Sequence, residues 1–278
     1  MCNNSLIRYR HWFKLWIIEG LSIRFLCKLS GYSKFKLQSI KNYWLQQTPA
    51  ECIDYSSIHY LVFDGTYFHK DGCLLSLMDA VEQQIVSQLY VKKESFREAY
   101  PWFTSLKSQG LNPAVITTDG EQSIIRAIKL IWPGVKLQRC LYHIQHEGMR
   151  WLRTHPKTEA GRKLRSILAG LSSIKTSDEQ VAFIRSYLNW KERYAEFVLS
   201  LPRSTVAFKD LKRTMALLDH ALPDMFHYLS DSNIHSTTNA LESFHSRLKA
   251  DYRRHRGLTK EHRIQYLHWY RYFKNIRN

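Results

Sequence analysis

The spacing of apolar residues separates a short helical region at the start of the chain from the rest of the sequence. Residues 20–45 carry apolar side chains at helical spacing on both sides of the sequence SGYS. Gly31 there allows a turn, and Ser33 can cap the next helix. Two short helices around a glycine turn are typical of a helix-turn-helix. An ordinary helical hairpin with a solvated basic face would show the same pattern, so both interpretations stay open.

The pattern then changes from helical to strand spacing. Residues 46–57 lack periodicity and are expected to form a linker. Short apolar runs bounded by glycine and charged turns come next, and helical runs separate the later ones. The expected order is βββαβαβα, which indicates an α/β fold that begins with an antiparallel meander. The expected strands are 58–64, 73–80, 84–91, 114–119 and 135–140, and the expected helices are 95–110 and 121–132.

The last part of the chain shows only helical spacing. From about 158 to 235 the amphipathic pattern predicts an all-helical insertion. A long helix is expected over 236–254, a break at 255–258, and a final helix after it. We therefore expect a helical module at 1–50 and an α/β domain at 51–278 that contains the insertion.

The charge of the chain indicates a polyanionic partner. Lysine and arginine number 41 against 24 acidic residues, a formal net charge of +17 over 278 residues. Nucleic acid is the simplest partner for such a charge, although a merely basic surface would have the same composition. The five cysteines form no CxxC pair, and no apolar run has the length of a membrane span. We therefore expect a cytoplasmic protein that has no membrane partner.

Two groups of side chains are candidates for binding DNA. The second N-terminal helix offers polar side chains suited to phosphates and base edges. A basic run at 247–256 provides a second group. The candidates are Lys34, Lys36, Gln38, Lys41 and Asn42 in the first group, and Arg247, Lys249, Arg253, Arg254 and Arg256 in the second.

Two aspartates occupy equivalent places at the ends of expected strands. Asp64 ends the first strand and Asp119 the fourth, and each is followed by glycine. If these two strands are neighbours, both carboxylates lie at one edge of the sheet. Carboxylates so close repel unless a cation lies between them, and such hard oxygen ligands suit Mg²⁺ or Mn²⁺. The alternative is that each Asp-Gly pair only forms a turn.

A third carboxylate lies near the start of the long helix expected over 236–254. Glu242 falls on the polar face of that helix, beside a buried stripe that contains Leu241 and Phe244. It could complete a metal site with the two aspartates. The alternative is a capping box, in which Asn239 caps the helix and Glu242 reaches back to its amide.

Four motifs together resemble a known family. VFDGTYF, TTDGEQSI, RCLYHIQ and TTNALESFHSRLK with HRGL after it are similar to the transposases of the Mutator-like superfamily, in particular the bacterial insertion-sequence type. The resemblance covers about residues 55–278. It implies an RNase H-like core with a DDE triad, which matches Asp64, Asp119 and Glu242. It also implies a C-x-x-H motif, which matches Cys140 and His143. Many relatives carry a longer N-terminal region with a zinc-binding cysteine cluster, which this chain lacks.

The resemblance implies a DNA transposase. Such an enzyme cleaves DNA and transfers strands with two Mg²⁺ ions, for which Mn²⁺ can substitute. It acts on double-stranded DNA, at transposon ends and target, as a homo-oligomer and associated with the nucleoid. Two alternatives stay open: a DNA-binding remnant without catalysis, and an RNase H-like nuclease that cuts without joining.

Cys140 and His143 are too few to hold zinc alone, and His146 adds only a loose third ligand. We expect the pair, together with Asn239, to support the active-site edge, or the pair to contact DNA. A buried thiol with a hydrogen-bonded histidine is the alternative.

Overall fold

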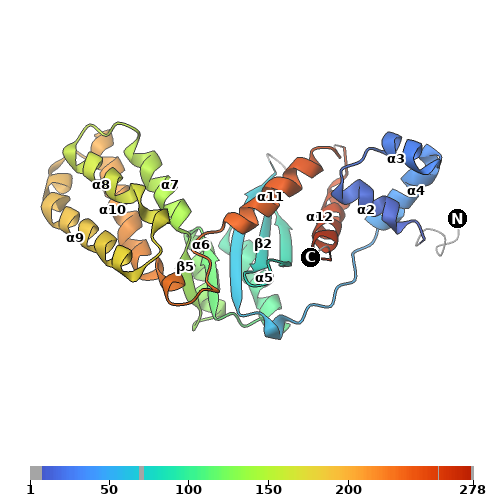
Figure 1. Cartoon of the computed structure of the whole chain (residues 1–278), viewed down its shortest axis with the longest axis horizontal. Coiled ribbons are helices and arrows are strands. Elements are labelled where there is room, and N and C mark those ends of the chain that lie inside the picture. Colours follow the sequence, from blue (N-terminus) through green and yellow to red (C-terminus); the bar gives the residue numbers. More distant parts are fainter. Residues whose placement is uncertain (1–7, 69–71, 256, 277–278) are drawn as a thin grey trace.

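A five-stranded mixed sheet forms the centre of the molecule (Figure 1). The computed structural model describes residues 8–68, 72–255 and 257–276. The strand order is β3-β2-β1-β4-β5. β1, β2 and β3 form the expected antiparallel meander, and β4 and β5 run parallel to β1. The strands are β1 Tyr60–Tyr67, β2 Cys73–Asp79, β3 Ile85–Val91, β4 Val115–Thr118 and β5 Lys136–Arg139.

The alternation of side chains along the strands gives the sheet two buried faces. Leu61 and Phe63 of β1 pack with helices α5 (Phe96–Ser108) and α6 (Gln122–Ile131) on one face. Val62 points to the opposite face, which is covered by α11 (Asn239–Tyr252) and α12 (Lys260–Asn275). Because successive residues of a strand face opposite sides, Asp64 lies on the face of Val62, towards α11.

A helical lobe lies beside the β5 edge of the sheet (Figure 1). Its helices pack around one hydrophobic cluster that includes Leu141, Tyr187 and Leu218. The lobe also includes residues before 158, because α7 belongs to the same cluster. Its helices are α7 Leu141–Leu152, α8 Glu159–Ala169, α9 Ser177–Ser200 and α10 Val206–Ala221. Short 3-10 turns complete the described chain: η1 Tyr55–Ser57, η2 Leu171–Ser173, η3 Leu222–Asp224 and η4 His227–Leu229.

Three N-terminal helices, α2 (Arg10–Ile18), α3 (Ile23–Ser30) and α4 (Lys34–Leu45), form one group, in which α2 and α4 pack against the C-terminal helix α12 and α3 packs against α2 and α4. Between α3 and α4, Gly31 adopts a positive φ of 71°, and the Ser33 hydroxyl accepts a hydrogen bond from Lys36 N at 3.3 Å. These are the turn and the cap that the sequence predicts.

Aromatic residues join these helices to the rest of the molecule. Trp269 Nε1 donates to the carbonyl of Trp44 at 2.9 Å, and the Tyr266 hydroxyl donates to the carbonyl of Ile17 at 3.1 Å. The N-terminal helices therefore share one hydrophobic cluster with α11, α12 and one face of the sheet. Across the described residues, no helix combines the length and the apolar character needed to cross a membrane.

Candidate active site

Asp64 lies inside β1 and not at its end. The strand continues to Tyr67, so the interpretation of Asp64 as part of an Asp-Gly turn is wrong. Only 7% of Asp64 is exposed. Its Oδ2 accepts a hydrogen bond from Nδ1 of His245, on α11, at 2.9 Å. The strand therefore presents this carboxylate to α11 and not to open solvent.

Asp119 comes directly after β4, as the sequence predicts. β1 and β4 are parallel neighbours with Val62 opposite Thr117, so the same register brings Asp119 level with Asp64. Asp119 and Gly120 also form a turn, which was the alternative to a metal-binding role. The Oδ1 atom of Asp119 accepts a hydrogen bond from the amide of Glu121 at 3.1 Å, and Gly120 has a φ of 105°. A turn and a place at the sheet edge are compatible for this residue.

Glu242 lies in the first turn of α11, and the capping-box interpretation of this residue is wrong. The helix begins at Asn239, and the N-cap position belongs to Thr238, which makes no side-chain cap bond. The carboxylate of Glu242 instead accepts a hydrogen bond from the Thr238 hydroxyl at 2.6 Å. Asn239 is exposed. Glu242 is therefore held by a side chain and does not satisfy the helix terminus.

The three carboxylates lie close enough to affect one another. Burial raises the pKa of Asp64, and the charges of Asp119 and Glu242 raise it further, whereas the hydrogen bond from His245 lowers it. A cleft of about 420 Å³ is lined by Asp64, Glu242 and His245 together with Lys249 and Arg253. The cleft thus combines buried acids with bases that could contact a phosphate.

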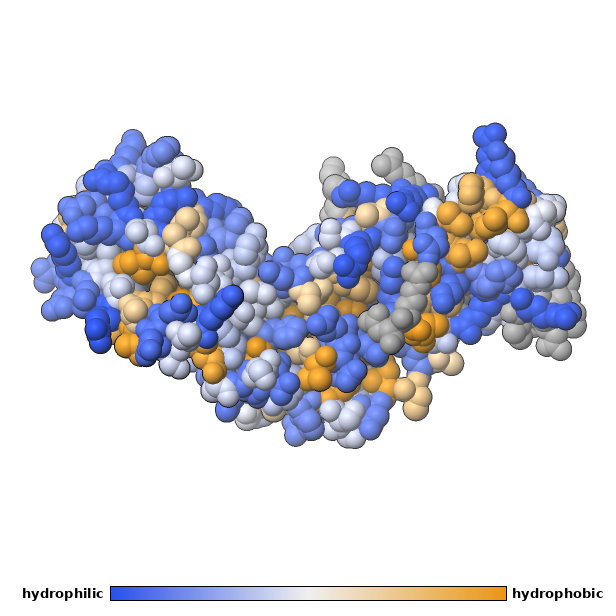
Figure 2. Space-filling view, viewed as in Figure 1, coloured by the Kyte–Doolittle hydropathy of each residue, from blue (hydrophilic) through white to orange (hydrophobic). Residues whose placement is uncertain are grey.

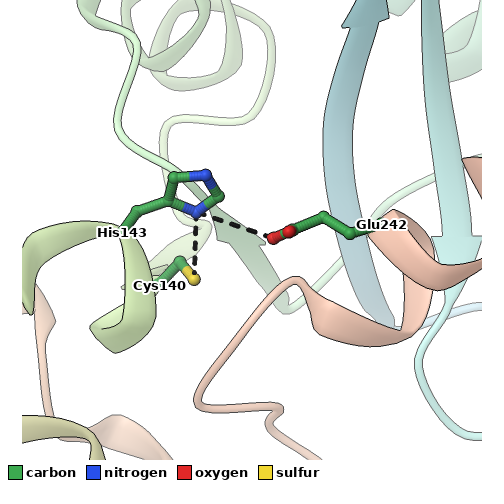
Figure 3. Close-up of side chains that lie close together, drawn as sticks. All are labelled: Cys140, His143 and Glu242. Atoms are coloured by element: carbon green, nitrogen blue, oxygen red, sulfur yellow. Dashed lines mark hydrogen bonds and ion pairs between the residues drawn. The ribbon is translucent and has the colours of Figure 1, made fainter. Parts of the chain in front are cut away.

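Cys140 and His143, at the start of α7, lie opposite Glu242 of α11 (Figure 3). Cys140 is fully buried at the junction of β5 and α7, and His143 lies in the first turn of α7. His143 Nδ1 lies 3.3 Å from Cys140 Sγ and 3.8 Å from Glu242 Oε1. One ligand atom from each of these three residues lies within 4.8 Å of the others, a group that could hold a metal ion.

The sulfur of Cys140 already accepts hydrogen bonds. The amide of Thr238 donates to Sγ at 3.3 Å and its hydroxyl lies 3.5 Å away. The hydrogen bond with Cys140 raises the pKa of His143 to about 9; burial opposes this shift, and the charges of Asp119 and Glu242 add to it. His143 is therefore a cation near neutral pH, placed beside the acids. Oxygen ligands from Asp64, Asp119 and Glu242 suit a hard divalent ion better than this sulfur does.

Two ionisable side chains that the sequence does not single out lie against the glycines after the aspartates. A Cβ on Gly65 would stand 2.5 Å from Oε2 of Glu94, and a Cβ on Gly120 would overlap the guanidinium of Arg139. Arg139 Nη2 donates to the carbonyl of Asp119 at 3.3 Å. Each glycine therefore leaves room for a large ionisable side chain. The only signal in the sequence was the glycine itself, which is also typical of a turn.

Burial raises the pKa of Glu94 to about 8, and the charges of Asp119, Asp64 and Glu121 raise it further. Glu94 comes after β3, in a loop beside lysines, and nothing in its sequence context marks it. It is a fourth acid beside the sheet edge, and near neutral pH it holds a proton.

The predicted DNA-binding residues lie in two separate places. Lys249 and Arg253 line the cleft, and Arg247 and Arg254, close to them in the sequence, are exposed. Arg256 lies outside the described residues. The structure does not bring the α4 group to the cleft. Lys34 and Asn42 are exposed and Gln38 is half-buried, whereas Lys36 stacks over the Tyr32 ring at 3.7 Å and Lys41 lies over Trp16 at 5.8 Å.

Comparison with known proteins gives one family match. Residues 60–147 match the family model of the MULE transposase domain. No curated protein matches the chain. Among solved structures, the chain is similar to the simian T-cell lymphotropic virus intasome in complex with the PP2A regulatory subunit B56 gamma. The identity is 15% and the TM-score 0.24, over 75% of this chain and 68% of that one. Residues 60–147 include Asp64, Asp119, Cys140 and His143, and the chain therefore carries a Mutator-like element transposase domain.

Proposed function

We propose that the protein is a DNA transposase of the bacterial insertion-sequence type, with an RNase H-like core and a DDE triad of Asp64, Asp119 and Glu242. The family match over residues 60–147 supports a transposase. The strand order 3-2-1-4-5, with only β2 antiparallel to its neighbours, supports the RNase H-like assignment. Helices α3 and α4 are the proposed DNA-reading module.

The observation that carries the proposal is that three acids from separate elements lie close enough for their charges to act on one another, and that two of them, Asp64 and Glu242, line one basic cleft. Asp64 comes from β1, Asp119 from the end of β4, and Glu242 from α11, and the charges of the latter two act on Asp64. Three acids held this close are unfavourable without a cation, which favours a metal site. The hard oxygen ligands fit two Mg²⁺ ions, or Mn²⁺ in their place.

The residues around the acids have distinct tasks in this proposal. When bound, the metal ions supply the charge that activates the attacking hydroxyl and stabilises the leaving oxygen. Lys249 and Arg253 hold the DNA backbone in the cleft. Thr238 orients Glu242 through the 2.6 Å hydrogen bond, and Cys140 orients Thr238. His143 adds a positive charge at the edge of the site, where a phosphate would lie.

The test uses purified protein, DNA duplexes with the ends of the element, and Mg²⁺. We expect cleavage and joining of 3′ ends by the unsubstituted protein. Asp64→Asn, Asp119→Asn and Glu242→Gln each keep the shape and remove one charge. Each should reduce both steps by orders of magnitude, because each ~1.4 kcal/mol of lost stabilisation is tenfold in rate. DNA affinity should be kept or rise.

Glu196→Gln is the matched control, since it removes one exposed carboxylate from the helical lobe. Cleavage without joining would instead identify a nuclease. Binding without any metal-dependent cleavage would identify a DNA-binding remnant. A triad variant with an unchanged rate would contradict the role of that residue.

We also propose that the protein binds DNA as a homo-oligomer, which sedimentation of the protein–DNA complex tests. The proposed location is the nucleoid.

A further inference from the structure

A row of buried polar side chains crosses three neighbouring strands under α11. Asp64 on β1 lies opposite Ser76 on β2, and Ser76 lies opposite Gln88 on β3. Directly opposite residues of neighbouring strands point to the same face of a sheet. Their exposed fractions are only 7%, 0% and 7%. A polar row on an otherwise apolar face is costly unless its members are hydrogen-bonded.

His245 completes this row from above. It is 2% exposed and lies one turn after Glu242 on α11. Its Nδ1 is 2.9 Å from Asp64 Oδ2, and its Nε2 is 2.9 Å from the Ser76 hydroxyl. The ring therefore bridges two strands, and both of its nitrogens have a partner.

The Asp64 carboxylate only accepts hydrogen bonds, so the ring donates to it from Nδ1 and is left with Nε2 as an acceptor. The Gln88 side-chain amide donates to the Ser76 hydroxyl at 3.2 Å. That hydroxyl is then free to donate its one hydrogen to Nε2 of His245. An imidazole that accepts at Nε2 has its hydrogen at Nδ1 and donates it to Asp64. The row is thus a directed chain of hydrogen bonds that runs from Gln88 to the carboxylate.

We infer that His245 is a positioning residue that fixes the orientation of the Asp64 carboxylate for metal binding, and that Ser76 and Gln88 hold the ring in the donating form. The inference rests on the proposed role of Asp64 as a metal ligand. A single bond to Oδ2 restricts rotation of the carboxylate about its Cβ–Cγ bond. One helix then supplies both an acid, Glu242, and the support of another acid.

Replacing His245 by Asn or by Gln tests the hydrogen bonds of its two ring nitrogens separately. Asn can place its amide nitrogen close to the position of Nδ1, and Gln close to that of Nε2. His245→Asn should therefore keep the bond to Asp64, whereas His245→Gln should keep only the contact with Ser76. Because loss of such a supporting bond typically weakens metal binding about 10- to 100-fold, we expect that loss for Gln and affinity close to the unsubstituted protein for Asn.

Binding is measured on the full chain with Mn²⁺, from the electron paramagnetic resonance signal of the free ion, alongside the thermal midpoint without metal. Ser76→Ala is a second variant and should weaken Mn²⁺ binding in the same direction, because Nε2 loses its donor. His268→Asn, on α12 and away from the cleft lining, is the matched control for loss of a histidine and should bind Mn²⁺ normally.

Equal Mn²⁺ affinities for His245→Gln and the unsubstituted protein would overturn the inference. Equal losses for Gln and Asn would overturn it as well, because a purely structural role does not distinguish the two amides. Asp64→Asn separates this failure from failure of the proposed function. Normal Mn²⁺ binding by Asp64→Asn would refute its role as a ligand. If Asp64→Asn loses Mn²⁺ binding but His245→Gln binds Mn²⁺ normally, only the positioning role of His245 is refuted.

Discussion

One side-chain hydrogen bond each holds Asp64 and Glu242 in this cleft. Thr238 links Glu242 to Cys140 through two hydrogen bonds. Its hydroxyl donates to the Glu242 carboxylate, and its amide donates to the buried sulfur of Cys140. The residue is fully buried just before α11 begins. Removing only the hydroxyl of Thr238 should therefore change the orientation of the Glu242 side chain while α11 stays intact.

Thr238→Val replaces the hydroxyl by a methyl group of similar size. A hydrogen bond to a charged group contributes about 1.5–3 kcal/mol, so we expect the cleavage rate to fall roughly tenfold or more. Thr238→Ser retains the hydroxyl and should restore most of the rate. The measurement is single-turnover cleavage of an end duplex. Equal rates for the Val and Ser variants would show that the hydroxyl has no part in positioning Glu242.

Glu94 makes the metal-free protein sensitive to alkaline pH. Its pKa is about 8 in the folded chain and about 4.3 when unfolded. Between these values the folded state binds a proton that the unfolded state lacks, so the free energy of unfolding falls as pH rises. We expect the thermal midpoint in chelator to fall from pH 6 to pH 9. Glu94→Gln should flatten this fall, and a slope equal to that of the unsubstituted protein would contradict the burial argument.

The secondary-structure elements could largely be predicted from the sequence, whereas their contacts could not. Strand alternation predicts which face of β1 holds Val62 and thus Asp64, and Asp119 comes after β4 as expected. His245 was missed because a histidine on the buried stripe of a helix is typical of a core position. Glu94 was missed because its loop is polar and charged. The importance of both residues becomes visible only in the folded structure, where His245 contacts Asp64 and Glu94 lies against Gly65 of β1.

The contact between α2 and α12 has a pH-sensitive residue within it. His255 is buried, with its ring 4.2 Å from Trp16 and 5.4 Å from Tyr266. Among the described residues, its Nε2 has no hydrogen-bond partner. Burial lowers the pKa of His255 to about 4, which means that the folded state holds it neutral near pH 5.

The unfolded chain protonates this histidine near pH 6.5. Between about pH 6.5 and 4 the unfolded state thus binds the extra proton, and stability falls as pH falls. Because Glu94 acts in the opposite direction over this range, the comparison is made in the Glu94→Gln background, where we expect the thermal midpoint to decrease from pH 7 to pH 5 and His255→Phe to lessen the decrease. Chemical denaturation at both pH values gives the same comparison as a free energy of unfolding. A decrease as steep in the Phe variant would place the sensitivity elsewhere, for example at His268.

At the scale of the whole molecule, the net charge of +17 contrasts with one exposed apolar patch. Figure 2 shows polar surface over most of the visible face and an apolar patch over α3 and α4. Phe25, Leu29 and Phe35 are 51%, 56% and 75% exposed there. If the protein binds DNA as proposed, we expect charge, and not this patch, to set the affinity for a duplex, because binding to phosphates releases counterions.

We therefore expect the logarithm of the DNA binding constant to fall linearly with the logarithm of salt concentration. Each neutralised phosphate contributes about 0.9 to that slope. Lys249→Ala combined with Arg253→Ala should reduce the slope by about two if both side chains contact phosphates in the cleft. Fluorescence anisotropy over a salt series measures it. Lys209→Ala with Arg185→Ala, in the helical lobe, is the matched control, and the same reduction there would argue against the cleft as the contact.

The helical lobe leaves and rejoins the sheet at one point. The amide of Leu141, at its start, donates to the carbonyl of Ser236 at 2.9 Å, and Thr238 bonds Cys140 beside it. Because these bonds hold the two ends of the lobe together, the number of residues between them has little effect on the position of Glu242. The separation of Asp119 from Glu242 (242 − 119 = 123) is therefore a poor criterion for recognising related chains. Two proteins could share this site and differ widely in that interval, and a search by fixed spacing would separate them.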